Sequence, residues 1–430
     1  MPTTDRPERV PGAARVFAHL RRELWARQRP HGLMGFAYLW PGKDPRVRHH
    51  RRLWWRSGPA WPRVLWLGLE VLLWLRWQLV HAGPASRRAL ARFGATVARA
   101  EGIPPHIQQR RVIALARRWC IAPAEAYYFG LYHTPEAALD YVFAQETQAY
   151  HATRSAGRPR DDQARALLRD KATFADFARA LGIRCPQTLA LVSPGGEDIA
   201  PLHGAIDRAG RVFCKLNKGH AGRGAFTAWR EDNTLRGRLL NTSESNDLDG
   251  NDSDLDDDRA VRSAWRRLLA ADTVLIQPCL RNHPRLATVA WRDETITIRV
   301  LTGWSHPADT VPPTAVCRSA VVEIAISPPT HGGSGYAVQT LDPLTGKPGD
   351  MLLPLAASTR LLDSTPPHWV DIHAQSLSLQ GAFPDLVEIA WDWVITPEGP
   401  VLLEGNSNWG PTLPQMQLGG LLAVSVSTGP

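Results

Sequence analysis

The stretch DLVEIAWDWVITPEGPVLLEGNSNWG, residues 385–410, is the most informative part of this chain. Two apolar, strand-like runs flank a turn at residues 397–399, a pattern that predicts a β-hairpin. We expect a three-residue loop that pairs Thr396 with Pro400, with Gly399 as its left-handed residue.

Three oxygen-bearing side chains lie on these two runs and are the candidate metal ligands. Glu404 and Asn406 are two residues apart and therefore share one face of a strand. The three-residue loop would place Asp392 opposite Glu404 on that face, whereas a two-residue loop would turn Asp392 away, because a slip of one residue inverts every side chain. Two carboxylates and an amide suit a hard cation, and Mg²⁺ held with nucleotide phosphates is the usual combination. The competing interpretation is that these residues are only solvated.

The composition indicates a folded chain with an uneven distribution of charge. The 430 residues suffice for two or three domains, and 44% of them are apolar. The net charge of +9 is concentrated in residues 1–120, which hold about 23 Lys and Arg against 6 Asp and Glu. This basic third predicts an anionic partner, such as a membrane surface, and we expect no nucleic-acid partner.

Cysteine usage and the N-terminal sequence bear on location. The five cysteines are scattered, so the sequence predicts neither a zinc site nor a disulfide framework, and the odd count fits a reducing cytoplasm. The N-terminus has no apolar run, so no signal peptide is expected. We expect a cytoplasmic protein that could lie peripherally at the inner face of the membrane.

Residues 1–150 are expected to form a helical, basic, Trp-rich region. Residues 64–80 are the most apolar segment, and three interpretations stay open: a buried helix, a helix lying among lipid headgroups, and a spanning helix, for which the segment is short. His49 and His50 lie in a basic run, which favours a solvated face over a ligand pair.

From about residue 160 the pattern changes to alternating helices and strands. Residues 160–182 predict an amphipathic helix that ends at Gly182, and residues 211–229 predict two strands around a glycine-rich turn. The acidic, low-complexity insert at residues 241–258 is expected to be disordered. The later strands predict an antiparallel, β-rich part.

Candidate phosphate contacts lie at three places. Lys215 ends an apolar strand and is followed by Gly219, Gly222 and Gly224, and such glycines let a backbone approach an anion while the lysine adds positive charge. A structural hairpin explains this pattern as well, because the spacing matches neither a Walker loop nor a dinucleotide fold.

The other two places are a lysine at a helix start and an arginine inside a strand. Lys171 opens a helix directly after Asp170. Arg299 lies in the apolar strand ITIRV, where a buried arginine requires a phosphate or carboxylate partner.

The order of these features resembles the ATP-grasp fold. The closest resemblance is to the sugar-transfer-associated ATP-grasp family, related to α-L-glutamate ligases, over about residues 160–420. Four stretches carry it: LLRDKATFADFARALGI, VFCKLNKGHAGRG, TITIRVLTG and IAWDWVITPEGPVLLEGNSNWG. The resemblance implies an α+β domain over residues 160–425 with a glycine-rich lid. Its lid-bearing lobe would span residues 185–280 and its metal-binding lobe residues 281–425.

The resemblance also implies roles for individual residues. The phosphates of ATP would contact Lys171 and Lys215 beneath a lid that contains Gly219, Gly222 and Gly224. Adenine would be held through the backbone of the hinge strand at Gln277, Cys279 and Leu280. Arg299 would face the γ-phosphate or an acyl phosphate and act in catalysis with Lys215, and two Mg²⁺ ions would bind to Asp392, Glu404 and Asn406.

The implied activity is an ATP- and Mg²⁺-dependent ligase that activates a carboxylate as an acyl phosphate for attack by an amine or a similar nucleophile. Family association adds surface-polysaccharide or envelope modification, with a small-molecule or sugar-linked acceptor. A kinase-like phosphotransferase and a membrane-associated, degenerate ATP-binding module stay open as alternatives. The loop at residues 331–335 and Arg318 are candidates for the acceptor site; a plain turn and a surface arginine explain them equally well.

Overall fold

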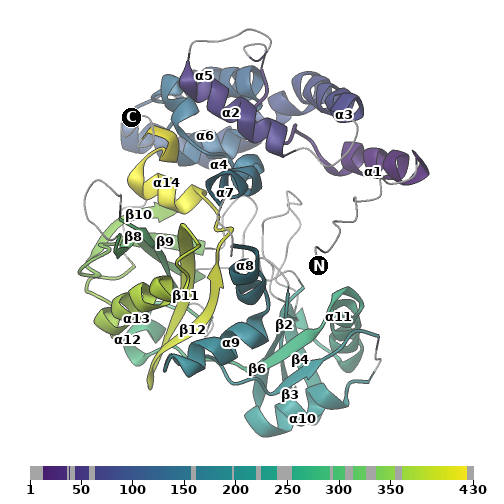
Figure 1. Ribbon diagram of the computed structural model, residues 1–430, viewed down its shortest axis with the longest axis vertical. Coiled ribbons are helices and arrows are strands. Elements are labelled where there is room, and N and C mark those ends of the chain that lie inside the picture. The colour runs from purple at the N-terminus through teal and green to yellow at the C-terminus, as the bar shows by residue number, and fades with distance from the viewer. Residues whose placement is uncertain are drawn as a thin grey trace, which may run out of the picture. The chain divides into compact units, whose positions relative to one another are not determined.

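The computed structural model describes residues 13–35, 38, 44–57, 63–155, 161–195, 198–218, 224–239, 254–290, 294–305, 313–325, 336–353 and 361–423 (Figure 1). The chain divides into two compact units. One unit comprises Met1–Ala156 with Gly410–Pro430, and the other comprises Gly157–Trp409.

The N-terminal unit is helical in its described part. Asp44 begins its second helix by accepting a hydrogen bond from the Arg46 amide, and Gly102 ends the fourth in the left-handed conformation, with φ of 70°. Its helices are α1 (Ala13–Ala26), α2 (Pro45–Arg56), α3 (Arg63–Arg76), the π-helical turn η2 (Trp77–His81), α4 (Ala82–Glu101), α5 (Pro105–Trp119), α6 (Pro123–Tyr128), the 3₁₀ helices η3 (Pro135–Asp140) and η4 (Ala144–Glu146), α7 (Thr147–Ser155) and α14 (Thr412–Leu418). No helix in the described ranges has the length and apolarity needed to cross a bilayer.

The C-terminal helix α14 belongs to this unit, whereas the sequence predicts that the ATP-grasp domain continues to residue 425. The Gln415 side chain explains the difference, because its carbonyl accepts from the Val142 amide at 2.7 Å and its Nε2 donates to the Val142 carbonyl at 2.7 Å. These buried bonds fix α14 to the N-terminal unit.

The second unit contains two antiparallel, six-stranded sheets, which confirms the predicted α+β class. The first sheet has the order β1-β6-β2-β3-β4-β5. Its strands are β1 (Ala190–Val192), β2 (Arg211–Leu216), β3 (Phe226–Glu231), β4 (Thr234–Leu239), β5 (Asp254–Leu255) and β6 (Val274–Pro278). Helices α10 (Ala200–Ala209) and α11 (Asp258–Ala271) bury an apolar core against it, which includes Leu202, Phe226 and Trp265.

The second sheet has the order β10-β9-β8-β7-β11-β12. Its strands are β7 (Thr297–Trp304), β8 (Ala315–Ala325), β9 (Tyr336–Leu341), β10 (Pro348–Leu353), β11 (Glu388–Thr396) and β12 (Gly399–Asn406). Helices α8 (Asp161–Arg169), α9 (Lys171–Ala180), α12 (Pro284–Ala287) and α13 (Trp369–Ala382) complete the unit. Every residue of β11 is buried, and Trp391 and Trp393 have no exposed surface, so this strand forms the centre of the core.

Two predictions about this unit are wrong in part. Residues 161–180 form two helices instead of one, because Asp170 accepts from the Thr173 amide at 3.1 Å and thereby begins α9. The end of the acidic insert is ordered, since Leu255 is buried in β5 and the side chain of Asp257 begins α11. Residues 241–253 of the insert lie outside the described residues.

Candidate functional site

The hairpin of β11 and β12 has a shorter loop than the sequence predicts. Thr396 pairs with Gly399, so the turn contains two residues, Pro397 and Glu398. The predicted three-residue loop is therefore wrong, although Gly399 does have a positive φ, of 118°.

A β-bulge in β12 places Asp392 and Glu404 on the same face of the hairpin despite the shorter loop. Trp393 pairs with Leu402 and Asp392 pairs with Glu404, so Leu403 is an extra residue in β12. Side chains of a strand alternate between the two faces of the sheet, and one extra residue reverses this alternation from that point on. The reversal offsets the one residue by which the loop is shorter than predicted. Asp392 and Glu404 are therefore direct partners across the two strands.

Asn406 contacts both of the other candidate metal ligands. The Asn406 amide nitrogen Nδ2 donates to Asp392 Oδ2 at 3.3 Å and to Glu404 Oε1 at 3.0 Å. In the described residues no cluster of three or more His, Cys, Asp and Glu side chains could hold a metal. The site therefore offers two carboxylates and one neutral amide, an oxygen set that fits Mg²⁺.

Gly405 separates the two candidate ligands of β12, Glu404 and Asn406, and lies over the buried Trp391. A Cβ atom at Gly405 would collide with the Trp391 ring and come within 3.0 Å of Leu168. We expect Gly405→Ala to lower the free energy of unfolding by about 1–3 kcal/mol in urea denaturation, because the Trp391 ring is fully buried and its Nε1 is hydrogen-bonded to Thr302. Gly410→Ala is the matched control, since no atom lies within 4 Å of a Cβ there. Equal stability of the two variants would contradict this packing.

Lys171 connects α9 to the hairpin of β11 and β12. Its Nζ lies 3.5 Å from Glu404 Oε2. The turn that carries Lys171 is held by Asn217, whose Oδ1 accepts from the Ala172 amide at 2.9 Å and whose Nδ2 donates to Asp170 Oδ1 at 3.0 Å. Asn217 directly follows β2, so it fixes Lys171 relative to the strand that carries Lys215. Asn217 is not among the site residues predicted from the sequence.

Lys215 on β2 interacts electrostatically with the same cluster. Burial, with a smaller effect from the nearby Lys171, lowers the pKa of Lys215 to about 8, although the Glu404 and Asp392 carboxylates act in the opposite direction. The cluster also shifts the two carboxyl groups. Burial raises the pKa of Asp392 to about 6 against the effect of Arg299. Burial also acts to raise the pKa of Glu404, but Lys171 and Lys215 outweigh it and the pKa falls below its usual value.

Arg299 on β7 has the anionic partner that its position in an apolar strand predicts. Its Nε donates to Asp392 Oδ1 at 2.8 Å and its Nη2 donates to Asp392 Oδ2 at 3.2 Å. Its Nη1 lies 3.1 Å from Glu323 Oε1 on β8. Glu323 is not among the residues predicted from the sequence, although a carboxylate inside the apolar run AVVEIAIS is the same signal that identified Arg299. The predicted contact of Arg299 with a phosphate stays a prediction.

The predicted lid and hinge are only partly described. Gly219 and Gly222 lie outside the described residues, and Gly224 has a left-handed φ of 72°. At the hinge, Gln277 is buried in β6 and Pro278 has no N–H. The Cys279 amide donates to the Arg211 carbonyl at 3.1 Å, so it is already used within the sheet. Adenine binding by Gln277, Cys279 and Leu280 stays a prediction.

The two acceptor-site candidates differ in what the structure shows of them. Residues 331–335 lie outside the described residues. The Arg318 Nη2 donates to the Trp304 carbonyl, and its Nε lies 3.3 Å from Glu388 Oε1. Arg318 thus links three strands, β7, β8 and β11, within its sheet.

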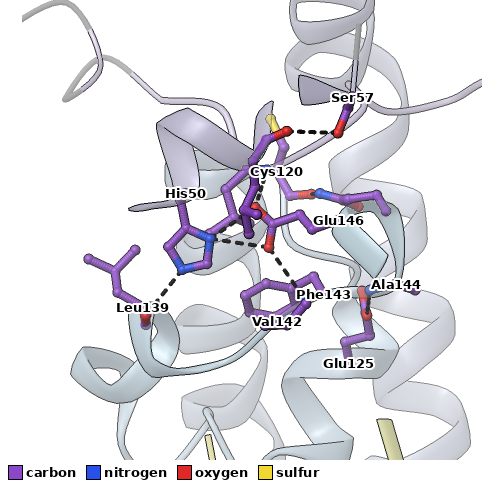
Figure 2. Close-up of polar contacts among 12 residues, drawn as sticks. His50, Ser57, Cys120, Glu125, Leu139, Val142, Phe143, Ala144 and Glu146 are labelled. Carbon is purple, nitrogen blue, oxygen red and sulfur yellow. Dashed lines mark hydrogen bonds and ion pairs between the residues drawn. The ribbon is translucent and has the colours of Figure 1, made fainter. Parts of the chain in front are cut away.

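The N-terminal unit contains a second polar cluster, around His50, where the sequence predicts a solvated face. That expectation is wrong for His50, which has no exposed surface. Figure 2 shows the His50 ring between Glu146 and the Leu139 carbonyl. Its Nδ1 lies 2.9 Å from Glu146 Oε1, and its Nε2 lies 3.1 Å from the Leu139 carbonyl oxygen. Because both ring nitrogens face acceptors, the contacts favour the doubly protonated imidazolium.

We expect the His50 contacts to stabilise the N-terminal unit in a pH-dependent way. Burial lowers the pKa of His50, but Glu146 and the Leu139 carbonyl outweigh it, so the pKa lies above its usual value. A raised pKa gives stability that is complete below about pH 6.5 and is lost as the pH rises through the folded-state value. Urea denaturation of His50→Gln should show a loss of about 2 kcal/mol at pH 6 and less at pH 8.5. The exposed His106→Gln is the control; a loss for His50→Gln that does not change with pH would contradict the imidazolium.

Comparisons with known proteins give structural similarities only. No protein-family model and no curated protein matches the sequence. Solved structures that the chain is similar to include the D-cycloserine synthetase DcsG, with 16% identity over 61% of this chain and 70% of that chain and a TM-score of 0.35. They also include the ATP-grasp ligase PsnB complexed with minimal precursor, with 12% identity over 66% of this chain and 70% of that chain and a TM-score of 0.34.

A third similar structure is the ADP complex of PurK, N5-carboxyaminoimidazole ribonucleotide synthetase. It has 11% identity over 56% of this chain and a TM-score of 0.32. The match spans only 45% of the PurK chain. Neither family nor activity follows from similarities of this size, so the function proposed below depends on the contacts of this chain.

Proposed function

We propose that residues 157–409 bind ATP with Mg²⁺ in the manner of an ATP-grasp enzyme and use it to ligate a carboxylate to an amine or a similar nucleophile. The observation that carries this proposal is the contact between Lys171 and Glu404, at 3.5 Å. It joins the two halves of the predicted site, which are the phosphate-binding lysines and the metal-binding hairpin. Lys171 and Glu404 are 233 residues apart in the sequence. Asn217 and Lys215 support it from a third segment.

The charges of the cluster suit a polyanion bound with metal. Three cationic side chains (Lys171, Lys215 and Arg299) face three carboxylates (Asp392, Glu404 and Glu323), and these charges balance formally. Such a site has little affinity for a bare anion or a bare cation, because either would meet a like charge. A nucleotide whose charge is neutralised by Mg²⁺ would fit both halves at once.

Each half has a distinct task in the proposed reaction. Lys171 and Lys215 would bind the phosphate oxygens, and Arg299 would keep the Asp392 carboxylate ionised and oriented. Asp392, Glu404 and Asn406 would hold Mg²⁺, which when bound supplies charge neutralisation at the phosphates. Positioning and charge compensation are the main contributions that a protein makes to phosphoryl transfer.

The proposed chemistry has two balanced steps. An oxygen of the substrate carboxylate attacks the γ-phosphorus of ATP, the bond to the bridging oxygen breaks, and ADP leaves. The nucleophile then attacks the acyl carbon, inorganic phosphate leaves with the bonding electron pair, and an amine loses one proton. The resemblance to sugar-transfer-associated ATP-grasp sequences supports surface-polysaccharide or envelope modification as the setting, with a small-molecule or sugar-linked acceptor. The five scattered cysteines support a cytoplasmic location.

Two lysines at the end of β2 allow a matched test of the site. Lys215 interacts with the cluster, whereas Lys218 is 60% exposed and pairs with Asp170 at 3.7 Å. We expect Lys215→Gln to weaken the binding of Mg·ATP about 10- to 100-fold in calorimetric titration, because a charged contact to phosphate is lost. Lys218→Gln should change the affinity less than about threefold. Equal effects of the two substitutions would contradict the proposed site.

A further inference from the structure

Helix α3 (Arg63–Arg76) places its one acidic residue inward. Glu70 has no exposed surface. Its Oε2 accepts from the His31 amide at 3.0 Å and from Trp54 Nε1 at 2.9 Å, and its Oε1 contacts the His31 ring. The same face buries Trp66 and Leu73. The carboxylate is therefore satisfied inside the unit, as a buried charge must be.

The opposite face of α3 is exposed and apolar. We call it the outer stripe, and it consists of Val64, Leu65, Gly68, Val71, Leu72 and Leu75, continued in η2 by Leu79. These positions recur at the spacing of one helix face, and no charged residue lies among them. Val64 is 79% exposed and Leu79 is 82% exposed. The solvent-exposed face of a helix normally carries polar and charged residues, so an apolar outer stripe indicates a surface that contacts something other than water.

Tryptophan and arginine flank the outer stripe. Trp25 and Trp55 are both exposed. The guanidinium of Arg76 lies 5.9 Å from the Trp25 ring centre, and that of Arg63 lies 5.9 Å from the Trp55 ring centre. Tryptophan side chains with one apolar and one polar end, next to arginine, are typical of the boundary between lipid headgroups and acyl chains.

The charge around the outer stripe indicates whether its binding partner is a lipid bilayer or a second copy of the chain. Residues 1–120 hold about 23 Lys and Arg against 6 Asp and Glu, so two copies meeting through this face would bring like charges together. Of the nearby acidic residues, Glu70 is buried and Glu23 lies 3.7 Å from Arg27. An anionic lipid surface complements both the apolar stripe and the basic surroundings.

We propose that the outer stripe inserts into the headgroup region of an anionic bilayer, with α3 lying along the membrane surface. A stripe of this kind binds through its buried apolar area and through attraction between arginine and anionic lipid. This inference does not depend on nucleotide binding, because all of its residues belong to the N-terminal unit.

Flotation of the full chain with vesicles, without nucleotide, tests this inference. The vesicles contain phosphatidylcholine alone or with about 30% phosphatidylglycerol, a fraction typical of anionic membranes. The wild type should float with the anionic vesicles and about tenfold less with the neutral ones. Leu72→Gln/Leu75→Gln should reduce the partition about tenfold or more, because two leucine side chains are withdrawn from the apolar region.

Controls separate the outer stripe from general effects. Leu344→Gln alters a leucine that is 74% exposed in the other unit and should leave flotation unchanged. Val64→Gln, at the other end of the stripe, should reduce the partition about threefold without changing the circular dichroism spectrum. Three results would overturn the inference: no flotation of the wild type, undiminished flotation of the double variant, or a wild-type dimer in sedimentation velocity that the double variant abolishes.

Discussion

Glu404→Ala should lower ATP turnover at least about 100-fold and leave the fold intact, because it removes one of two carboxylates that would hold Mg²⁺. The Glu404 side chain is 26% exposed, so its loss leaves no void in the core. Its removal also leaves Lys171 and Lys215 with less opposing charge. Nucleotide affinity measured without Mg²⁺ should therefore not fall, whereas the gain in affinity on adding Mg²⁺ should disappear.

The measurement is ADP release with an acceptor pair that supports turnover in the wild type. Glu398→Ala is the matched control, because Glu398 is an exposed glutamate in the turn of the same hairpin. It should retain wild-type turnover and thermal stability. Wild-type turnover in Glu404→Ala, or an equal loss in Glu398→Ala, would remove the role that we assign to Glu404.

Arg299→Met should lower the free energy of unfolding by about 3 kcal/mol, because it removes the guanidinium that pairs with both the Asp392 and Glu323 carboxylates. The two bonds from Arg299 to Asp392 are 2.8 and 3.2 Å, and the contact with Glu323 is 3.1 Å. Added Mg²⁺ should recover part of the loss, since a cation near Asp392 would replace some of the missing charge. Urea denaturation with and without Mg²⁺ measures both effects.

Two further variants show whether this loss is specific. Arg179 pairs with Asp176 at the surface of α9, and Arg179→Met should cost less than about 1 kcal/mol. Arg299→Met combined with Asp392→Asn should be less destabilised than the sum of the single variants, since the repulsion between carboxylates is removed. Strict additivity would show that Arg299 and Asp392 do not interact energetically.

The hairpin shows how much the sequence can predict about the site. The spacing of Glu404 and Asn406 was sufficient to place both residues on one face. The loop length was predicted wrongly because residues 401–403 are all apolar, so the alternation that would reveal a bulge at Leu403 is absent. The predicted pairing of Asp392 with Glu404 is therefore correct, although the loop length from which it was derived is wrong.

Contacts between distant segments were not predictable in the same way. Asn217 lies in the short segment KLNK, and nothing in that pattern indicates that its side chain holds the start of α9. His50 lies among arginines, and only the fold brings Glu146 to its ring. The composition of residues 64–80 indicated an apolar helix, but the inward position of Glu70 depends on His31 and Trp54.

Calorimetric titration of ATP into the full chain, with Mg²⁺ and with EDTA, tests the central claim most directly. We expect saturable binding with Mg²⁺, with a Kd between about 1 µM and 1 mM, and at least about tenfold weaker binding in EDTA. Absence of binding under both conditions, or equal binding with and without Mg²⁺, would contradict the assignment of Asp392, Glu404 and Asn406 to a metal–nucleotide site.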